Sequence, residues 1–289
     1  MNSNPILIVA GEPYSIFSEI LLKSLKKNRF KKPLILITSF NLIKDQAKKL
    51  NYKCSINLIN ENFKNHELKK NTINLINVNF NYKKIFDKIS NSSKVYNQKC
   101  FEIALKLLKK KNFSGFINGP ISKKNFLNKK FPGITEYISK KFSTEKNCML
   151  IYNKNLSVCP LTTHLPIKQV SKKINKKLIT EKVILINNFY KKVLGITPKI
   201  AVLGLNPHCE SILKYNEDEK IIKPLVSKLT KKFKISGPFP ADTIFIKNIR
   251  KKFDVIIGMY HDQVLTPIKT LYEYDAINIT LGLPFIRIS

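Results

Sequence analysis

Residues 6–38 read ILIVAGEPYSIFSEILLKSLKKNRFKKPLILIT, and this stretch decides the fold class. The apolar run Ile6–Ala10 predicts a buried strand that ends at Gly11, where the chain turns. Ile16–Leu25 follows with apolar residues at helical spacing, and Pro33–Thr38 is a second short apolar run. A strand, a helix and another strand in this order predict parallel strands that are covered by helices.

The same alternation of apolar runs and helical patterns continues along the chain. Further strands are predicted at Gly115–Asn118, Leu156–Leu161, Lys199–Gly204 and Asp254–Gly258. Further helices are predicted at Leu42–Leu50, Val95–Lys110, Thr180–Val193 and Glu219–Lys232. The pattern therefore predicts an α/β protein with a largely parallel sheet. The stretch Tyr52–Asn81 is rich in Asn and Lys and is interpreted as an excursion or a surface hairpin.

Composition narrows the class of protein. The chain has 289 residues, 43% of them hydrophobic, which is enough for a large core in one large domain or two lobes. No run of about 18 apolar residues exists, so no membrane span is expected. The N-terminal residues lack the pattern of a secretory signal. The five cysteines are scattered without a C-x-x-C pair, so we expect reduced thiols and a cytoplasmic location.

The formal net charge of +33 admits two interpretations. One is a nucleic-acid-binding protein, and the other is a lysine-rich chain that carries its charge on solvated faces. Pairs of lysines recur along the whole chain, for example at Lys26–Lys27, Lys172–Lys173 and Lys231–Lys232, and no nucleic-acid-binding motif accompanies them. We therefore favour the second interpretation, in which the charge still attracts anions such as phosphorylated substrates and dinucleotides.

Three of the four histidines follow directly after predicted strands. His164 lies in T-T-H-L-P, His208 in G-L-N-P-H and His261 in M-Y-H-D-Q. Ligands of open α/β sheets bind at the carboxyl ends of strands, and neutral imidazoles bind zinc and similar ions. A single histidine is more often a packing or hydrogen-bonding residue. Three in the same context favour a metal site with an open position for substrate.

Three further motifs bring glycine turns and charged groups to strand ends. G-P-I-S-K at Gly119–Lys123 can cradle a phosphate or carboxylate, or it is an ordinary loop. G-P-F-P-A-D-T at Gly237–Thr243 predicts a rigid turn that leads into a helix. The alternative is a purely structural turn in which Asp242 caps the helix. Arg287 can grip an anion through two hydrogen bonds, although a lone terminal arginine is usually solvated. No G-x-G-x-x-G follows the first strand, so a standard Rossmann dinucleotide site is not supported.

Taken together, these motifs resemble the 4-hydroxythreonine-4-phosphate dehydrogenase family. They occur in the family's order from Gly11 to Ser289, and the most specific are T-T-H-L-P, G-L-N-P-H, G-P-F-P-A-D-T, M-Y-H-D-Q and N-I-T-L-G-L-P-F-I-R at residues 278–287. The resemblance implies a three-layer α/β/α fold of the isocitrate/isopropylmalate dehydrogenase type, with two lobes and a cleft. We place the first lobe at residues 1–128 plus 267–289. The second lobe, with the metal-ligand motifs and the dimer interface, is placed at residues 129–266.

The resemblance also implies an activity. The family oxidises the C3 hydroxyl of 4-phosphooxy-L-threonine with NAD or NADP. The 2-amino-3-oxo-4-phosphooxybutanoate so formed decarboxylates to 3-amino-2-oxopropyl phosphate, a step of vitamin B6 biosynthesis. The family works as a homodimer with shared active sites, in which three histidines from both subunits hold a divalent metal. The metal is commonly zinc, with magnesium or cobalt as alternatives. Those ligands correspond to His164, His208 and His261.

Other family roles carry over onto matching positions. The substrate-binding residues of the family correspond to Thr135, Lys269, Asn278 and Arg287. We further predict catalytic roles for Lys269 and Asp262, and cofactor contacts from Asn206 and Asp242. Asp262 or Asp242 is a candidate to orient a metal-ligating imidazole or to relay a proton.

Departures from the family pattern leave alternatives open. Ile134 replaces the family histidine that contacts substrate, which brings a four-carbon sugar-acid phosphate such as threonate 4-phosphate into consideration. The opening G-D-P-A-G-I-G-P-E has an altered form in Gly11–Glu19, and C-E-S at residues 209–211 replaces the usual acidic, glycine-rich continuation. The chain ends at Ser289, before the family's V-D-H-G-T-A segment, so part of the cofactor side is expected to be absent. A non-catalytic protein that binds anions or nucleic acid is the alternative of a different class.

Overall fold

The structure is a computed structural model, and it describes residues 4–127, 131, 133–144, 146–210 and 216–289. The chain forms two compact units: unit 1 comprises residues 1–143 and 284–289, and unit 2 comprises residues 144–283. The sequence placed the lobe boundaries after residues 128 and 266. In the structure the chain leaves unit 1 after Ser143 and returns to it at Pro284. The assignment of functional lobes stays a prediction.

Unit 1 is built on a parallel sheet with the strand order β3-β4-β2-β1-β5-β12. The strands are β1 (Ile6–Val9), β2 (Leu34–Thr38), β3 (Ile56–Ile59), β4 (Ile73–Asn77), β5 (Gly115–Asn118) and β12 (Arg287–Ile288). β1 pairs in parallel with β2, where Ile6 lies opposite Leu34, and with β5, where Ile6 lies opposite Gly115. The parallel strands predicted from residues 6–38 are thereby confirmed.

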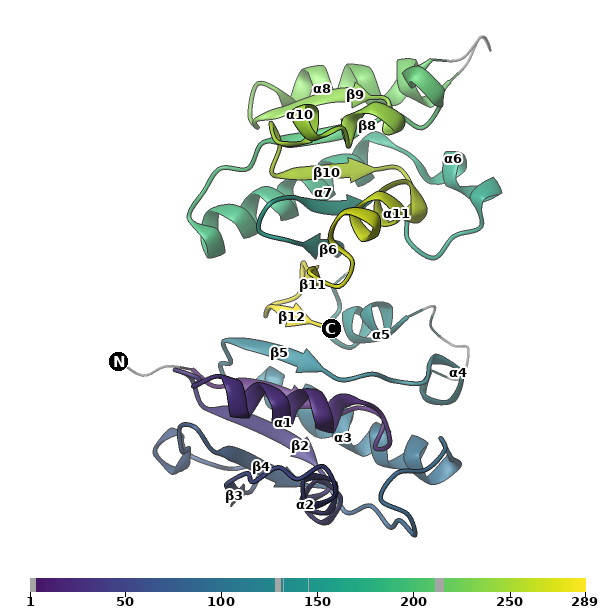
Figure 1. Ribbon diagram of the computed structural model, residues 1–289. Helices are drawn as coiled ribbons and strands as arrows, with labels where there is room; N and C mark the ends of the chain where they lie inside the picture. The colour runs from purple at the N-terminus through teal and green to yellow at the C-terminus, as the bar shows by residue number, and fades with distance from the viewer. Residues whose placement is uncertain (1–3, 128–130, 132, 145, 211–215) are drawn as a thin grey trace. The chain divides into compact units, whose positions relative to one another are not determined.

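Helices cover both faces of this sheet (Figure 1). On one face lie α1 (Phe17–Lys27) and α2 (Phe40–Lys49), from which Leu21 and Ile43 pack against strand residues such as Leu36. On the other face α3 (Asn91–Lys110) contacts β1 and β2, and it begins with a capping box at Ser90. The unit also contains η1 (Asn65–Glu67), α4 (Lys123–Phe126) and α5 (Ile134–Lys141).

The interpretation of Tyr52–Asn81 as an excursion or hairpin was wrong. Two parallel strands occupy this stretch, because β3 pairs in parallel with β4, and β4 pairs in parallel with β2. β4 was not predicted because Asn74 interrupts its apolar run, although the side chain of Asn74 is fully buried. Its Nδ2 donates to the carbonyl oxygens of Leu34 at 3.0 Å and Lys69 at 2.9 Å, which satisfies this polar group inside the unit.

Unit 2 is built on a mixed sheet with the strand order β11-β6-β7-β10-β8-β9. The strands are β6 (Cys148–Tyr152), β7 (Ser157–Pro160), β8 (Ile200–Leu203), β9 (Ile235–Phe239), β10 (Val255–Gly258) and β11 (Ile277–Leu281). β7, β10, β8 and β9 are parallel, whereas β6 is antiparallel to both β7 and β11. Gly237–Phe239 ends strand β9 instead of forming the expected turn, and the expected helix, α9 (Ala241–Ile244), follows.

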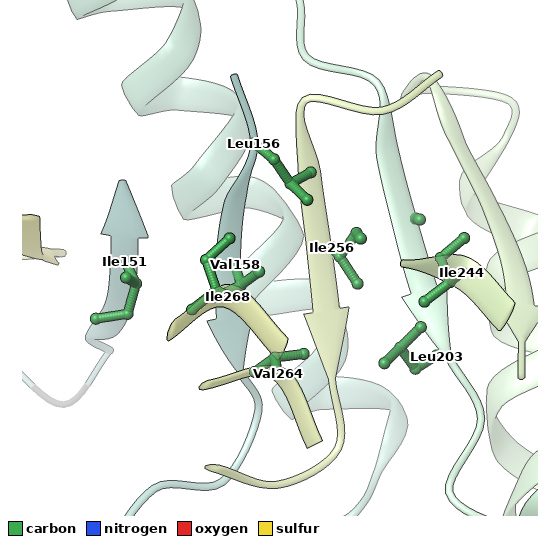
Figure 2. Close-up of a cluster of buried hydrophobic side chains, with 9 residues drawn as sticks. Ile151, Leu156, Val158, Leu203, Ile244, Ile256, Val264 and Ile268 are labelled. Atoms are coloured by element: carbon green, nitrogen blue, oxygen red, sulfur yellow. The ribbon is translucent and has the colours of Figure 1, made fainter. Parts of the chain in front are cut away.

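An apolar core joins the sheet of unit 2 to its helices. Val264 and Ile268 of α11 (His261–Tyr272) and Ile244 of α9 pack against strand residues such as Val158 and Ile256 (Figure 2). The opposite face of the sheet is covered by α7 (Lys176–Phe189) (Figure 1). The other helical segments are α6 (Val170–Lys173), α8 (Lys223–Leu229), α10 (Lys247–Arg250), η2 (Ile167–Gln169), η3 (Tyr190–Leu194), η4 (Pro207–Cys209) and η5 (Asp218–Ile222). The predicted α/β/α class is confirmed.

Most predicted helices correspond to observed ones. The helix predicted over Val95–Lys110 is part of α3, and the helix predicted over Thr180–Val193 corresponds to α7 and η3. Strand β6 was missed, because it pairs antiparallel with β7 through a short turn and breaks the strand–helix alternation on which the prediction relied. Among the described residues, no helix is both long and apolar enough to cross a bilayer.

Candidate functional site

A histidine-bearing loop leaves the carboxyl end of each of three adjacent parallel strands, β7, β10 and β8. Gly258 at the end of β10 lies opposite Pro160 at the end of β7, and β8 pairs with β10 on its other side. The three loops therefore emerge at one edge of the sheet of unit 2. Ligands of α/β sheets bind at this kind of edge, because loops from neighbouring strands converge there.

Two of the three histidines come together at this edge. The ring centroids of His164 and His261 lie 6.3 Å apart, with an angle of 35° between the ring planes. His261 begins α11, and its Nδ1 lies 2.8 Å from Oδ1 of Asp262. With Nδ1–H donating to this carboxylate, Nε2 of His261 presents its lone pair to a ligand. Neutral imidazole nitrogens are zinc ligands, so these two rings are the predicted ligands that the structure brings together.

His208 lies in the neighbouring loop but does not join the other two rings in a metal-binding group of one chain. Across the described part of the chain, no three His, Cys, Asp or Glu side chains are placed to hold one ion. His208 is exposed and has a left-handed backbone with φ 57° and ψ 11°, which is uncommon outside glycine. The histidines predicted as ligands thus form one pair and one separate imidazole.

Two polar side chains tie the three loops to one another. Thr162 Oγ1 donates to the carbonyl oxygen of Met259 at 2.8 Å. Gln263 accepts from the backbone N–H of Met259 at 2.7 Å, and its Nε2 donates to the carbonyl oxygen of Gly204 at 2.8 Å. Thr162 and Gln263 belong to the histidine motifs, but their roles were not predictable from the sequence, because hydrogen bonds between distant loops leave no spacing pattern.

A buried carboxylate holds the loop that carries His208. Asp218 is fully buried, and its oxygens accept from the backbone N–H groups of Leu205 at 2.7 Å and Asn206 at 3.0 Å. They also accept from Nδ2 of Asn206 at 2.8 Å, so this predicted cofactor contact already has a partner inside the protein. Sequence reasoning missed Asp218, because an acid flanked by Glu217 and Glu219 is typical of a solvated charge run.

Unit 1 holds the predicted anion-binding arginine. Arg287 is fully buried, so the expectation that a terminal arginine is usually solvated does not hold here. Its Nε donates to Oδ1 of Asn118 at 2.8 Å, and its Nη1 donates to Oγ1 of Thr135 at 2.9 Å. Burial lowers the pKa of Arg287 to about 10, and the charge of Glu136 acts in the opposite direction. Asn118, which the sequence analysis did not single out, donates through Nδ2 to the carbonyl oxygen of Gly119, so its side-chain oxygen is directed to the arginine.

The remaining predicted residues occupy separate positions. Lys269 is exposed on α11, with Nζ 5.5 Å from the ring centroid of Tyr274. Asn278 is on β11, and its buried side-chain oxygen has no hydrogen-bond partner among the described residues. Asp242 is exposed in the first turn of α9. Within the predicted set, only Thr135 and Arg287 belong to unit 1, and the others belong to unit 2.

Known proteins resemble the chain over almost its whole length. The family model described as Pyridoxal phosphate biosynthetic protein PdxA matches residues 29–289. A 4-hydroxythreonine-4-phosphate dehydrogenase of Sulfurihydrogenibium sp. is 37% identical over 291 residues, covering 98% of this chain and 88% of that protein. A D-threonate 4-phosphate dehydrogenase of Salmonella typhimurium is 27% identical over 297 residues, covering 100% and 90%. The crystal structure of a 4-hydroxythreonine-4-phosphate dehydrogenase from Klebsiella pneumoniae matches with a TM-score of 0.81 and 27% identity, covering 99% of this chain and 90% of that one.

Proposed function

Since the chain belongs to the family of pyridoxal phosphate biosynthetic protein PdxA, we propose that it is a metal-dependent dehydrogenase that oxidises 4-phosphooxy-L-threonine with NAD or NADP. The C3 carbon gives a hydride to the nicotinamide and the C3 hydroxyl gives its proton to a base, which yields 2-amino-3-oxo-4-phosphooxybutanoate. This 3-oxo acid then loses carbon dioxide and becomes 3-amino-2-oxopropyl phosphate. The names of the relatives support the dehydrogenase class and a phosphorylated substrate.

The observation that carries the proposal is the pairing of His164 with His261 where β7 and β10 end. Imidazole nitrogens are suitable donors for zinc, and magnesium and cobalt are the alternative metals. The two rings are neighbours, with 6.3 Å between their centroids, which supports a role for both at one ion. Because no third ligand joins the pair within the described residues of one chain, we infer that the set with His208 is completed between two copies. Each active site of the homodimer then needs both subunits.

The metal would supply Lewis-acid stabilisation for negative charge on the C3 oxygen of the substrate. Asp262 orients the ring of His261 through Nδ1, which leaves Nε2 for the metal. Lys269, on the same helix, is assigned to hold or relay the proton of the C3 hydroxyl. Asn278 offers a buried side-chain oxygen without a partner among the described residues, which suits an N–H or O–H donor of the substrate.

The phosphate or carboxylate of the substrate is assigned to Arg287. A guanidinium group carries several N–H donors on one rigid plane, and Arg287 donates from Nε to Asn118 and from Nη1 to Thr135. Both of these partners offer neutral oxygens and fix the plane of the group, and the charge of Glu136 also acts on it. For the dinucleotide, Asp242 and the side-chain oxygen of Asn206 are the assigned contacts, because Nδ2 of Asn206 already donates to Asp218.

Nicotinamide reduction by the purified protein tests the proposal. We expect NAD or NADP to be reduced only when 4-phosphooxy-L-threonine is present, and chelation of the metal should abolish turnover. The variant His208→Ala should lose both bound metal and turnover. Failure of the wild-type protein to reduce either dinucleotide with any of the three metals would contradict the proposed reaction. Full metal content in the variant would contradict only the role of His208.

A four-carbon sugar-acid phosphate, such as D-threonate 4-phosphate, is the second candidate substrate. Ile134 begins α5 next to Thr135 and presents an apolar side chain where the family has a histidine. A relative named for this second substrate aligns with the whole chain. The two substrates differ at C2, which carries an ammonium group or a hydroxyl group. The ratio of kcat/KM for the two compounds decides between them, and we expect it to favour 4-phosphooxy-L-threonine.

We also propose that the enzyme acts in a reducing compartment, the cytoplasm. All five cysteines are free thiols, although Sγ of Cys148 and Sγ of Cys159 lie only 3.2 Å apart in the core of unit 2. Two thiols in such close contact stay unbonded in the cytoplasm, because that compartment keeps thiols reduced. Light scattering of the purified protein measures the proposed dimer, and a monomeric mass would contradict the shared metal site.

A further inference from the structure

The loop after β8 adopts an uncommon backbone conformation. His208 and Cys209 both have positive φ angles, 57° and 60°, although neither is glycine. Each such residue costs of order 1 kcal/mol or more, so the conformation persists only where surrounding contacts determine it. The contacts that determine this loop therefore also determine where the imidazole of His208 lies.

Asp218 provides three hydrogen bonds to this loop. Its carboxylate accepts two backbone N–H groups, from Leu205 and Asn206, and one side-chain N–H, from Asn206. Within the described residues no lysine or arginine forms an ion pair with Asp218, although the side chain is fully buried. The N–H groups of the loop therefore stabilise the buried carboxylate of Asp218. The same hydrogen bonds hold the loop in place.

The fit between this loop and Asp218 is tight on the remaining sides. A Cβ atom at Gly204 would lie 2.8 Å from Oδ1 of Asp218 and 2.7 Å from Sγ of Cys209, so only glycine fits without a shift. The backbone N–H of Gly204 donates to the carbonyl oxygen of Phe239 at 3.0 Å. Its carbonyl oxygen accepts from Gln263, on the helix that begins with His261. The loop is therefore held from both sides, by Asp218 and by the helix that begins with His261.

We propose that Asp218 is a positioning residue for metal binding: it holds the loop of His208 so that this imidazole is preorganised to coordinate the divalent ion. The proposal rests on the proposed function, because it assumes that His208 is a ligand. Asp218 touches no ring nitrogen and acts through the backbone of Leu205 and Asn206. Partners that orient a metal ligand typically contribute about 10–100-fold to metal affinity.

Zinc affinity of the purified dimer, measured by competition with a chromophoric chelator, tests this role without any need for turnover. Asp218→Asn keeps the shape of the side chain but turns one acceptor into an N–H₂ group that faces N–H donors. We expect zinc to bind about 10–100-fold more weakly in this variant. Asn206→Ala removes only the side-chain hydrogen bond and should weaken zinc binding by about two- to tenfold. The zinc affinity of Asn206→Ala tests the proposal if Asp218→Asn does not fold.

Asp254→Asn is the matched control. Asp254 Oδ2 accepts from the backbone N–H of Lys199 at 2.7 Å, so it holds β8 by the same kind of bond at the opposite end of the strand. Its zinc affinity should stay within about twofold of the wild-type value. Equal loss in Asp254→Asn and Asp218→Asn would overturn the proposal, since it would show general loosening of the unit. Wild-type affinity in the Asp218 and Asn206 variants would overturn it as well. If the wild-type protein itself binds no zinc, magnesium or cobalt, the proposed function fails and the inference falls with it.

Discussion

At the scale of single residues, Arg287 links the packing of unit 1 to the proposed chemistry. Its pKa, although lowered by burial to about 10, stays above neutral pH, so the group remains a fixed positive charge. A lysine in its place keeps the charge but cannot reproduce separate donors on Nε and Nη1. We expect Arg287→Lys to raise KM for the phosphorylated substrate by about 10–100-fold, because a charge-assisted hydrogen bond contributes roughly 1.5–3 kcal/mol. Steady-state kinetics measure this change.

Arg250→Lys is the control for this substitution. Arg250 also donates through Nη1, in this case to the carbonyl oxygen of Phe245 at 2.7 Å, but it lies on α10, before the amino end of β10. Its KM should stay within about twofold of the wild-type value. A wild-type KM in the Arg287 variant would remove Arg287 from the substrate site.

Tyr190 gives a prediction for alkaline pH. Burial raises the pKa of its hydroxyl well above the ordinary value of 10.0, and the OH group donates to Oγ of Ser157 at 2.8 Å. A raised pKa in the folded state contributes stability that is complete below pH 10.0 and is lost as the pH rises further. Tyr190→Phe should lower the free energy of unfolding by about 1 kcal/mol at pH 8, through the lost hydrogen bond. It should also flatten the decline of stability above pH 10.0. Urea unfolding at a series of pH values measures both effects, and parallel pH curves for the two proteins would contradict the assignment.

At the scale of elements, the connection after β5 depends on a glycine. Gly119 follows β5, and a Cβ atom there would overlap the carbonyl oxygen of Ala10, directly after β1. Backbone atoms of two paired strands cannot easily move apart, so we expect Gly119→Ala to lower the free energy of unfolding by about 1–3 kcal/mol. Gly115→Ala, at the start of β5, is the control, because its Cβ would meet only the carbonyl oxygen of Ile286, at 3.5 Å. Urea denaturation compares the two variants, and equal stabilities would show that β1 and β5 can separate at no cost.

The success of the sequence prediction differed between elements for physical reasons. The parallel pairing of β1 with β2 was predictable, because strand, helix and strand follow one another within residues 6–38. β4 was not, because the hydrogen bonds that make Asn74 acceptable in the core come from Leu34 and Lys69, which no local pattern reveals. Periodicity identifies elements that bury an apolar face, and it misses those that bury a satisfied polar group.

The candidate site also has features that the sequence predicts and features that it does not. The position of the three histidines at strand ends was predictable from short motifs that follow apolar runs. The contacts that hold these loops were not predictable, since Thr162, Gln263 and Asp218 bond to backbone groups that directly follow β10 or β8. Such partners are set by which strands lie next to each other. The roles of the histidines themselves stay predictions until metal binding is measured.

At the scale of the whole molecule, the path of the chain places a buried arginine in unit 1. The chain passes through unit 2 and returns for its last described residues, which bring Arg287 beside Asn118 and Thr135. These contacts join residues that are 169 and 152 positions apart in the sequence. Arg287 therefore reaches its partners in unit 1 only after the chain has passed through unit 2. Its burial depends on these distant contacts, which is why the sequence favoured a solvated terminal arginine.

The net charge of +33 acts on the whole molecule, and it yields a prediction that separates the enzyme from a nucleic-acid-binding protein. A positive field raises the encounter rate with an anionic substrate, and salt screens it over a Debye length of about 10 Å at 0.1 M. We expect kcat/KM for 4-phosphooxy-L-threonine to fall as sodium chloride rises from about 0.05 to about 0.5 M, while kcat stays constant. Steady-state kinetics with NAD or NADP at each salt concentration measure both parameters. A kcat/KM that does not change with salt would show that the charge has no part in substrate capture. A salt-sensitive shift of RNA by a protein without dehydrogenase activity would instead favour the non-catalytic alternative, because release of counterions from phosphates gives that signature.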